Sequence, residues 1–330
     1  MYILTKAFLF LLIGFVLSII TGLILIPGLK KIKANQNLSV YLEERHKSKN
    51  NTPTFGGLIF IIPTILIMFL MFVLKKIEIS YTIVIILFTF LAYAFIGFVD
   101  DYLKIKRHNN DGLSENQKLI SQVIIALVFF YLFLRGGNEP LLWIHSLGIK
   151  QNIGFLYGIV ILLVLLASTN SVNVTDGLDG LAGGLSVIAL LTFGIIVFNT
   201  DWLYGYEDLG IFIFLLSGSV LGFLFFNSNP AKVFMGDTGS LALGGVLGGI
   251  SIITRHELLL IVIGIVFVLE MLSCIIQRIY YKKTKKRLFL MTPIHHAFEK
   301  KGMSERDIVK IFWCIGFIAS LLALIYGVVL

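Results

Sequence analysis

Long apolar runs alternate with short polar segments along the whole chain. Ten runs are predicted to be helices, at residues 7–29, 56–74, 79–99, 119–134, 154–167, 180–198, 209–226, 241–253, 258–280 and 308–330. Because a helix rises 1.5 Å per residue, about 20 apolar residues cross the ~30 Å hydrocarbon core of a bilayer. The pattern therefore predicts an all-α polytopic membrane protein with about ten transmembrane helices.

Two of these runs, 154–167 and 241–253, are short for a full crossing. Either they take residues from their flanks, or they stop short around a cavity. No repeat of fixed period and no low-complexity linker divides the chain, so we expect one domain over residues 1–330. The first run has no small-residue cleavage pattern, and we expect it to be a retained span rather than a signal peptide.

Composition supports the membrane class. The chain is 57% hydrophobic and only 14% charged, with a mean hydropathy of +0.93, which excludes a soluble domain. The net charge of +8 could suggest a nucleic-acid partner, but the basic residues fall between the apolar runs, where they orient spans. Cys274 and Cys314 lie inside apolar runs without metal-ligand spacing, so we interpret them as packing residues.

Charge also predicts the orientation. Of the 27 lysines and arginines, 21 lie in one set of alternate loops and 6 in the other. The positive-inside rule makes the first set cytoplasmic, with both termini outside. The polar motifs described next all belong to the first set, so we expect an active site that faces the cytoplasm.

Two adjacent acids, Asp100 and Asp101, directly follow the run 79–99, with Lys104 on the next turn. Neighbours on a helix point about 100° apart, so the two carboxylates cannot face the same ligand atom unless the helix ends there. We expect them to have different roles. One acid alone would be typical of a simple helix end, but two acids with a lysine favour a functional site.

The segment 170–184 contains acids, amides and glycines but no lysine or arginine. Asp176 and Asp179 would share a face if they were helical. A calcium loop is the obvious alternative, but the alternating oxygen ligands and the terminal Glu are missing. Carboxylates and amides also suit the donor groups of a nucleobase and a ribose, with helix capping as the simpler interpretation for a single Asp.

Two more segments of the same face suggest phosphate chemistry. Asp237 lies between glycines with hydroxyls at 238 and 240, where one carboxylate and phosphate oxygens could hold a hard cation. His295 and His296 could be zinc ligands, but no HExxH pattern or nearby cysteine supports this, and we interpret them as hydrogen-bond donors or proton carriers among phosphates. Together the loops have the composition of a Mg²⁺-dependent phosphoryl-transfer site.

At these residues the chain resembles the polyprenyl-phosphate N-acetylhexosamine-1-phosphate transferase superfamily, and within it the branch that transfers phospho-N-acetylmuramoyl-pentapeptide. The matching runs are 52–57, 100–104, 113–122, 170–182, 227–241 and 292–299, in the family's order. Thr175 before Asp176 and the Pro-Ile pair before His295 favour this branch. The family's third histidine is Ala297 here, so its role is either dispensable or replaced.

The resemblance implies transfer of phospho-MurNAc-pentapeptide from UDP-MurNAc-pentapeptide to undecaprenyl phosphate, giving lipid I and UMP at a bacterial plasma membrane. It implies that Asp237 holds Mg²⁺ and that Asp100, Asp101 and His295 are catalytic, by direct attack or through an aspartyl intermediate. The residues it implies for substrate binding are Lys49, Thr52, Thr54, Lys104, Lys118, Asn173, Asp176, Asp179, Asn227, Phe234, Gly236 and His296. We also expect a homodimer, membrane lipid as a partner, and no nucleic acid.

Two other functions fit parts of the sequence. One is the sister reaction on UDP-GlcNAc. The other is transport, for which Glu270, the one acid well inside an apolar run, is the best feature. A transport site should lie near the midplane, whereas the polar motifs lie at one face, so we expect Glu270 to hydrogen-bond within the bundle, with Gln277 as its partner.

The predicted orientation can be tested with single cysteines. Ser48→Cys and Ser228→Cys should resist a membrane-impermeant maleimide in intact cells, while Asn138→Cys should react, because only the last lies in a predicted outer loop. Labelling is read by gel shift. Reaction of the first two in intact cells would overturn the orientation.

Overall fold

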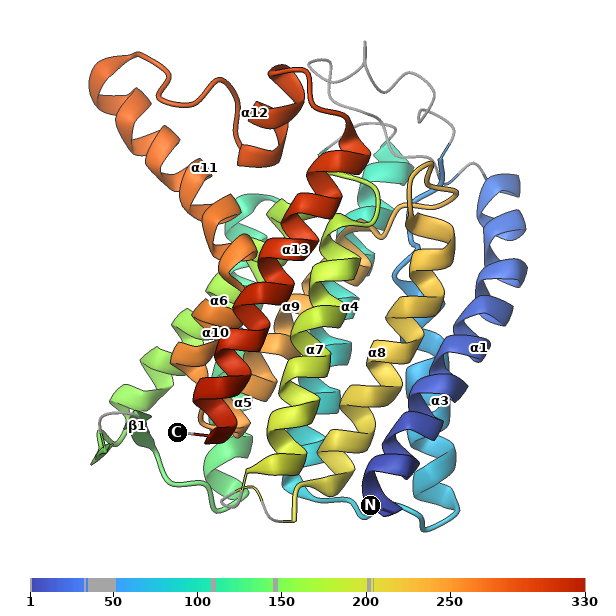
Figure 1. Cartoon of the computed structure of the whole chain (residues 1–330), viewed down its shortest axis with the longest axis vertical. Coiled ribbons are helices and arrows are strands. Elements are labelled where there is room, and N and C mark those ends of the chain that lie inside the picture. Colours follow the sequence, from blue (N-terminus) through green and yellow to red (C-terminus); the bar gives the residue numbers. More distant parts are fainter. Residues whose placement is uncertain are drawn as a thin grey trace.

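A computed structural model of the chain describes residues 2–32, 34, 52–107, 111–144, 148–200, 203 and 205–329. Its helices are α1 (Tyr2–Lys31), α3 (Leu58–Val73), α4 (Tyr81–Arg107), α5 (Glu115–Arg135), α6 (Leu156–Thr175), α7 (Leu181–Asn199), α8 (Glu207–Asn227), α9 (Gly236–Ile253), α10 (Glu257–Ile263), α11 (Ile265–Thr284), α12 (Ile294–Lys300), α13 (Glu305–Leu324) and the π-helix η4 (Ile325–Val329). Most of them run along one direction as a bundle (Figure 1). The predicted all-α class is confirmed.

Eight of the described helices are long and apolar enough to cross a membrane, or nine if a bent pair counts as one span. The bent pair is α10 and α11, which meet at Gly264 with an angle of 87°. The prediction of one continuous helix over 258–280 is therefore wrong, because the helix breaks at Gly264. Glycine weakens a helix, and Gly264 adopts a non-helical φ of −94° and ψ of 23°. α3, with 16 residues, is a shorter apolar helix.

The two runs that looked too short take residues from their flanks. α6 continues to Thr175 and reaches 20 residues, and α9 begins at Gly236 and reaches 18 residues. The added turns are the polar motif segments themselves. Asn173 therefore lies in the last turns of α6 and Asp237 in the first turn of α9, both on regular helix rather than on loops.

α9 is the central helix. Of the 18 residues of α9, 94% are buried, whereas only 28% of an 18-residue apolar stretch of α1, at the periphery, is buried. Small residues allow this packing, because they let backbones approach closely. A Cβ on Gly97 of α4 would collide with the backbone of Asp237, and a Cβ on Gly244 would lie 2.5 Å from the Cα of Thr169 in α6. The first turn of α9 is thus held directly against α4.

The two ends of the bundle differ. The start of α1 and the end of α13 lie at one end, while α12 and the last turns of α4 lie at the other (Figure 1). α4 has 27 residues, about 40 Å, so it is longer than the hydrocarbon core and its last turns extend beyond it. The acids of the predicted site are therefore at the end opposite the termini.

An unpredicted antiparallel hairpin, β1 (Leu141–Ile144) and β2 (Ile149–Asn152), lies at the end of the bundle that holds the termini (Figure 1). Arg255 fixes it, because its guanidinium donates to the carbonyls of Glu139 at 2.7 Å and Leu141 at 3.2 Å. The hairpin is remote from the polar motifs.

Gly97→Ala should destabilise the fold, because the added methyl group collides with the backbone of α9. Overpacking of this kind costs about 1–3 kcal/mol. We expect a lower melting temperature in detergent and a loss of activity, since the first turn of α9 must move.

Gly28→Ala in α1 is the matched control, because nothing lies within 4 Å of its added Cβ. Its melting temperature should match the parent or exceed it, since alanine favours helix. Equal melting temperatures for the two variants would contradict the close contact between α4 and α9.

Candidate active site

Two carboxylates and two lysines meet where α4, α5 and α9 converge. The Nζ atom of Lys104 lies 2.7 Å from the carboxylate of Asp100 and 3.2 Å from that of Asp237. The Nζ atom of Lys118 lies 3.1 Å and 2.7 Å from the same two groups. Each ammonium group therefore bridges both acids. Asp100 is fully buried, and such a buried charge persists only when it is paired.

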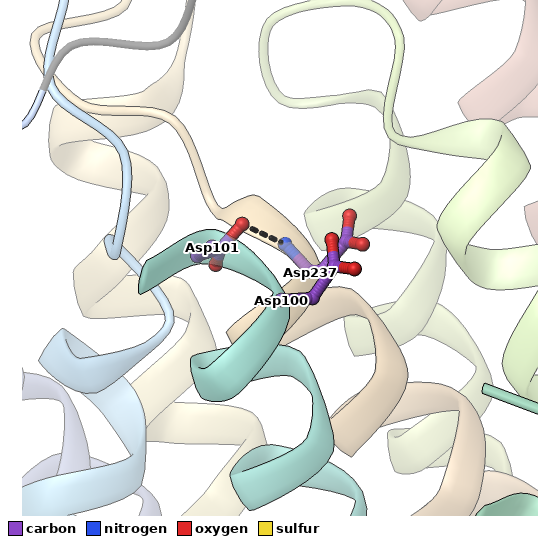
Figure 2. A group of neighbouring side chains, drawn as sticks. All are labelled: Asp100, Asp101 and Asp237. Atoms are coloured by element: carbon purple, nitrogen blue, oxygen red, sulfur yellow. Dashed lines mark hydrogen bonds between the residues drawn. The ribbon is translucent and has the colours of Figure 1, made fainter. Parts of the chain in front are cut away.

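Asp101 points away from this cluster (Figure 2). Its carboxylate accepts hydrogen bonds from the backbone N–H groups of Asp237 at 3.1 Å and Thr238 at 2.9 Å, and from the Thr238 hydroxyl at 2.6 Å. These donors belong to the first turn of α9, where N–H groups lack helical partners and the helix dipole favours a negative charge. Asp101 therefore caps α9, and the two adjacent acids lie in different surroundings.

The three acids fit a divalent cation. One carboxylate oxygen from each of Asp100, Asp101 and Asp237 lies within 4.8 Å of the others. Mg²⁺ takes oxygen ligands and is usually held by one or two carboxylates together with phosphate and water. Each acid already has three polar contacts, but two of those of Asp101 are backbone N–H groups of α9, which are fixed. Asp100 and Asp237 contact lysine side chains, which can move away, so these two acids are the better candidate ligands.

The end of α6 completes the cluster. The amide of Asn173 donates to the carboxylate of Asp237 at 2.9 Å and to the Ser240 hydroxyl at 2.8 Å. Asp176 follows directly after α6, and burial, together with the negative charges of Asp237, Asp101 and Asp179, raises the pKa of its carboxyl group to about 8. These surroundings therefore favour the protonated form of the Asp176 carboxyl group.

Asp179 and Asn227, which were also predicted to bind substrate, connect two loops through hydrogen bonds. Asp179 is buried, and its carboxylate accepts from the side chain of Asn229 at 3.1 Å. Asn227 is buried as well, accepting from the N–H of Gly180 at 3.0 Å and donating to the carbonyl of Val233 at 3.0 Å. Both residues tie the turn between α6 and α7 to the segment between α8 and α9.

The predicted motif near residue 54 pairs with that same segment. The N–H of Phe234 donates to the Pro53 carbonyl at 2.8 Å, and the N–H of Gly56 donates to the Phe234 carbonyl at 2.8 Å. Thr52 and Thr54 are buried beside this pairing. The segment therefore supports the start of α9.

Gly236 has a positive φ of 73°, which disfavours any other residue. A Cβ there would lie 2.5 Å from both the Asp101 carboxylate and the Thr54 hydroxyl. Glycine at this position thus lets Asp101 reach the N-terminus of α9. Lys49, another predicted substrate residue, lies outside the described residues.

The histidine motif forms buried pairs on α12. His295 and Glu270 are both fully buried, with His295 Nδ1 3.0 Å from a Glu270 oxygen. A Cβ on Gly177 would collide with His295 Nε2, so the turn after α6 lies directly on this ring. His296 Nδ1 lies 2.6 Å from a carboxylate oxygen of Glu299. His295 therefore holds α11, α12 and the turn after α6 together, whereas the pair of His296 and Glu299 lies within α12.

The predicted pairing of Glu270 with Gln277 is wrong. Gln277 instead accepts from the N–H groups of Leu288 and Phe289, each at 3.0 Å. Seven residues separate Gln277 from Glu270 on α11, but the two side chains have different partners. Ala297, where the family has a third histidine, is buried within α12.

Comparison with known proteins shows the family. A family model described as glycosyl transferase family 4 matches residues 83–255. The chain is 42% identical to the phospho-N-acetylmuramoyl-pentapeptide-transferase of Bacillus subtilis (strain 168), over 95% of each protein. It is 42% identical to the protein of that name from Listeria monocytogenes serotype 4b (strain F2365), over 94% of this chain and 95% of the other. The chain belongs to the phospho-N-acetylmuramoyl-pentapeptide transferase family.

Several residues that position the site of this transferase were not predicted. Glu270 and Glu299 hold the histidines, and Leu113 donates its backbone N–H to Asp100 at 2.7 Å. The position of Glu270 inside an apolar run was a visible signal in the sequence, but its pairing with His295 was not. Gln122, which accepts from Asn170 at 3.1 Å, lies in a recognised motif without an assigned role.

The different surroundings of the two adjacent acids give a sharp test. Asp101→Asn should lower the melting temperature as well as activity, because it removes the charge that caps α9 and weakens three hydrogen bonds. We expect about 1–3 kcal/mol of lost stability. Asp100→Asn should lower activity about 100-fold or more. Its melting temperature should fall less, because Lys104 and Lys118 keep the carboxylate of Asp237 as a partner.

Thermal unfolding in detergent and a UMP-release assay measure the two effects. Glu115→Gln is the control, since this acid of α5 is 91% exposed at the same end of the bundle. If Asp100→Asn and Asp101→Asn lost stability and activity equally, the assignment of Asp101 as a cap would be wrong.

Proposed function

We propose that this transferase moves phospho-MurNAc-pentapeptide from UDP-MurNAc-pentapeptide to undecaprenyl phosphate at its cytoplasmic face. The products are lipid I and UMP. The observation that carries the proposal is the buried cluster of Asp100, Asp237, Lys104 and Lys118, which lies where the polar motifs converge. Relatives at about 40% identity over about 95% of the chain, all named for the MurNAc-pentapeptide substrate, favour it over UDP-GlcNAc.

The charges of the cluster suit two phosphate-bearing substrates. Asp237, with Asp100 as second carboxylate, would hold Mg²⁺, which supplies positive charge to the phosphate oxygens. Lys104 and Lys118 would exchange part of their contact with the two acids for contact with those oxygens. Their ammonium groups stabilise the negative charge that moves from the lipid phosphate to the leaving UMP.

The reaction exchanges one phosphoanhydride for another. An oxygen of the lipid phosphate attacks the sugar-bearing phosphorus, the bond to the UMP oxygen breaks, and UMP leaves with the electron pair. Asp100 would accept a proton from the lipid phosphate, and Asp101 would keep α9 and Asp237 in position. We assign the carboxyl group of Asp176 to a hydrogen bond with the nucleotide, beside Asn173.

The cytoplasmic location rests on the excess of lysine and arginine in the loops at this end of the bundle. It also suits the substrates, because a charged sugar nucleotide reaches the site from water and a lipid phosphate reaches it from the membrane. The homodimer stays a prediction.

The bond types on the two sides of the reaction match, so it should be freely reversible. The equilibrium constant should lie within about tenfold of unity, roughly 1.4 kcal/mol. Excess UMP added to lipid I and purified protein should regenerate UDP-MurNAc-pentapeptide, measured by anion-exchange chromatography, and chelation of divalent cations should stop it.

Asp237→Asn should abolish both directions, because the amide keeps the shape but loses the charge that opposes the cation. Parallel forward assays with UDP-GlcNAc control for the sister reaction and should give no product. A forward reaction that runs to completion while UMP drives no back-reaction would refute anhydride exchange.

A further inference from the structure

A basic cavity lies on the arm formed by α11 and the segment that returns from it to α12. Its volume is about 480 Å³, within the range of small-molecule sites, roughly 300–1,000 Å³. The lining includes Gln277, Arg278, Arg287, Thr292 and Lys300. Three of its side chains carry a positive charge and none carries a negative one. The cavity therefore favours a ligand with several negative charges.

Hydrogen bonds fix the shape of this arm. The side-chain oxygen of Gln277 accepts from the N–H groups of Leu288 and Phe289, each at 3.0 Å. These bonds tie the returning segment to α11. Arg287, which directly precedes them, is thereby held close to the helix that carries Arg278.

The positive charge of the cavity is poorly neutralised by the protein. Arg278 lies 3.8 Å from Glu115, but both side chains are exposed, at 72% and 91%, so this pair contributes little. Within the part of the chain that the structure describes, neither Arg287 nor Lys300 forms an ion pair. The three cations are thus available to a ligand.

The cavity lies within reach of the active-site end. Thr292 is in its wall, three residues before His295, and Glu270 on α11 pairs with that histidine. Arg278 is eight residues further along α11, about 12 Å at 1.5 Å per residue. An extended pentapeptide spans about 17 Å. A peptide anchored beside the histidines can therefore reach the cations.

We propose that this cavity binds the acidic peptide of the sugar nucleotide, with Arg278, Arg287 and Lys300 contacting its carboxylates. The inference rests on the proposed function, since it takes UDP-MurNAc-pentapeptide as the substrate. The peptide carries at least the carboxylate of its last residue, and an arginine fork matches a carboxylate in shape and charge.

The test combines a cavity variant with a shortened substrate in nonionic detergent. Arg287→Gln with Lys300→Gln should raise the KM for UDP-MurNAc-pentapeptide about tenfold, because two charge-assisted contacts are lost. The KM for UDP-MurNAc-L-alanine, which cannot reach the cavity, should change less than twofold. Lys282→Gln with Lys283→Gln is the matched control, since it also removes two positive charges, from α11 but outside the cavity lining, and it should leave both values unchanged.

Other outcomes would show that the cavity does not bind the peptide. An equal rise in the KM for both nucleotide substrates would overturn the proposal. A rise in the KM for undecaprenyl phosphate instead would also overturn it and would favour a lipid phosphate as the ligand. If the shortened substrate is not turned over, its inhibition constant against the full substrate gives the same comparison. If the double variant does not fold, Lys300→Gln alone should still give about a threefold selective effect.

If the proposed transferase function itself is wrong, the experiment gives a different result. The unmodified protein would then release no UMP from UDP-MurNAc-pentapeptide in the presence of undecaprenyl phosphate. A working parent enzyme with a nonselective variant refutes only the peptide site.

Discussion

The structure depends on the contact between the end of α4 and the first turn of α9. Gly97 lets the two backbones touch, and Asp101 accepts three hydrogen bonds from the first turn of α9. Asp101 and Asp237 are 136 positions apart in the chain. Because this contact is made by backbone and by a buried carboxylate, it has little freedom to shift. It brings Asp100 and Asp237 to the same two lysines.

The resulting cluster keeps negative charge in a mostly buried place. Its two acids and two ammonium groups balance if all are ionised, and the carboxylate of Asp101 beside them leaves an excess of one negative charge. A buried charge is stable only with good partners, and here the lysines, the Asn173 amide and the Leu113 N–H supply them. In the proposed function, the same excess would attract a divalent cation, which the phosphate substrates would share. Electrostatics that stabilise the fold thus also favour phosphoryl transfer.

The 87° bend at Gly264 has a comparable effect on the other side of the molecule. It directs α11 away from the bundle, so that its far half extends beyond the helices it would otherwise pack against (Figure 1). Glu270 stays buried at the base of this arm and holds His295. The basic cavity lies further along α11. The bend therefore connects the transmembrane bundle to a projecting surface that carries its own charge pattern.

The sequence by itself determined the class, the positions of the apolar helices and the segments that carry chemistry. Those properties follow from hydrophobicity and local residue chemistry, which act over a few turns of helix. It also predicted that Asp100 and Asp101 would differ, because helical geometry separates neighbouring side chains by about 100°.

Tertiary structure decided which group meets which partner. Glu270 meets His295 rather than Gln277, the helix over 258–280 breaks at Gly264, and Asp179 and Asn227 join loops. Each of these outcomes depends on packing between segments distant in the chain, and no local pattern of residues encodes such a contact.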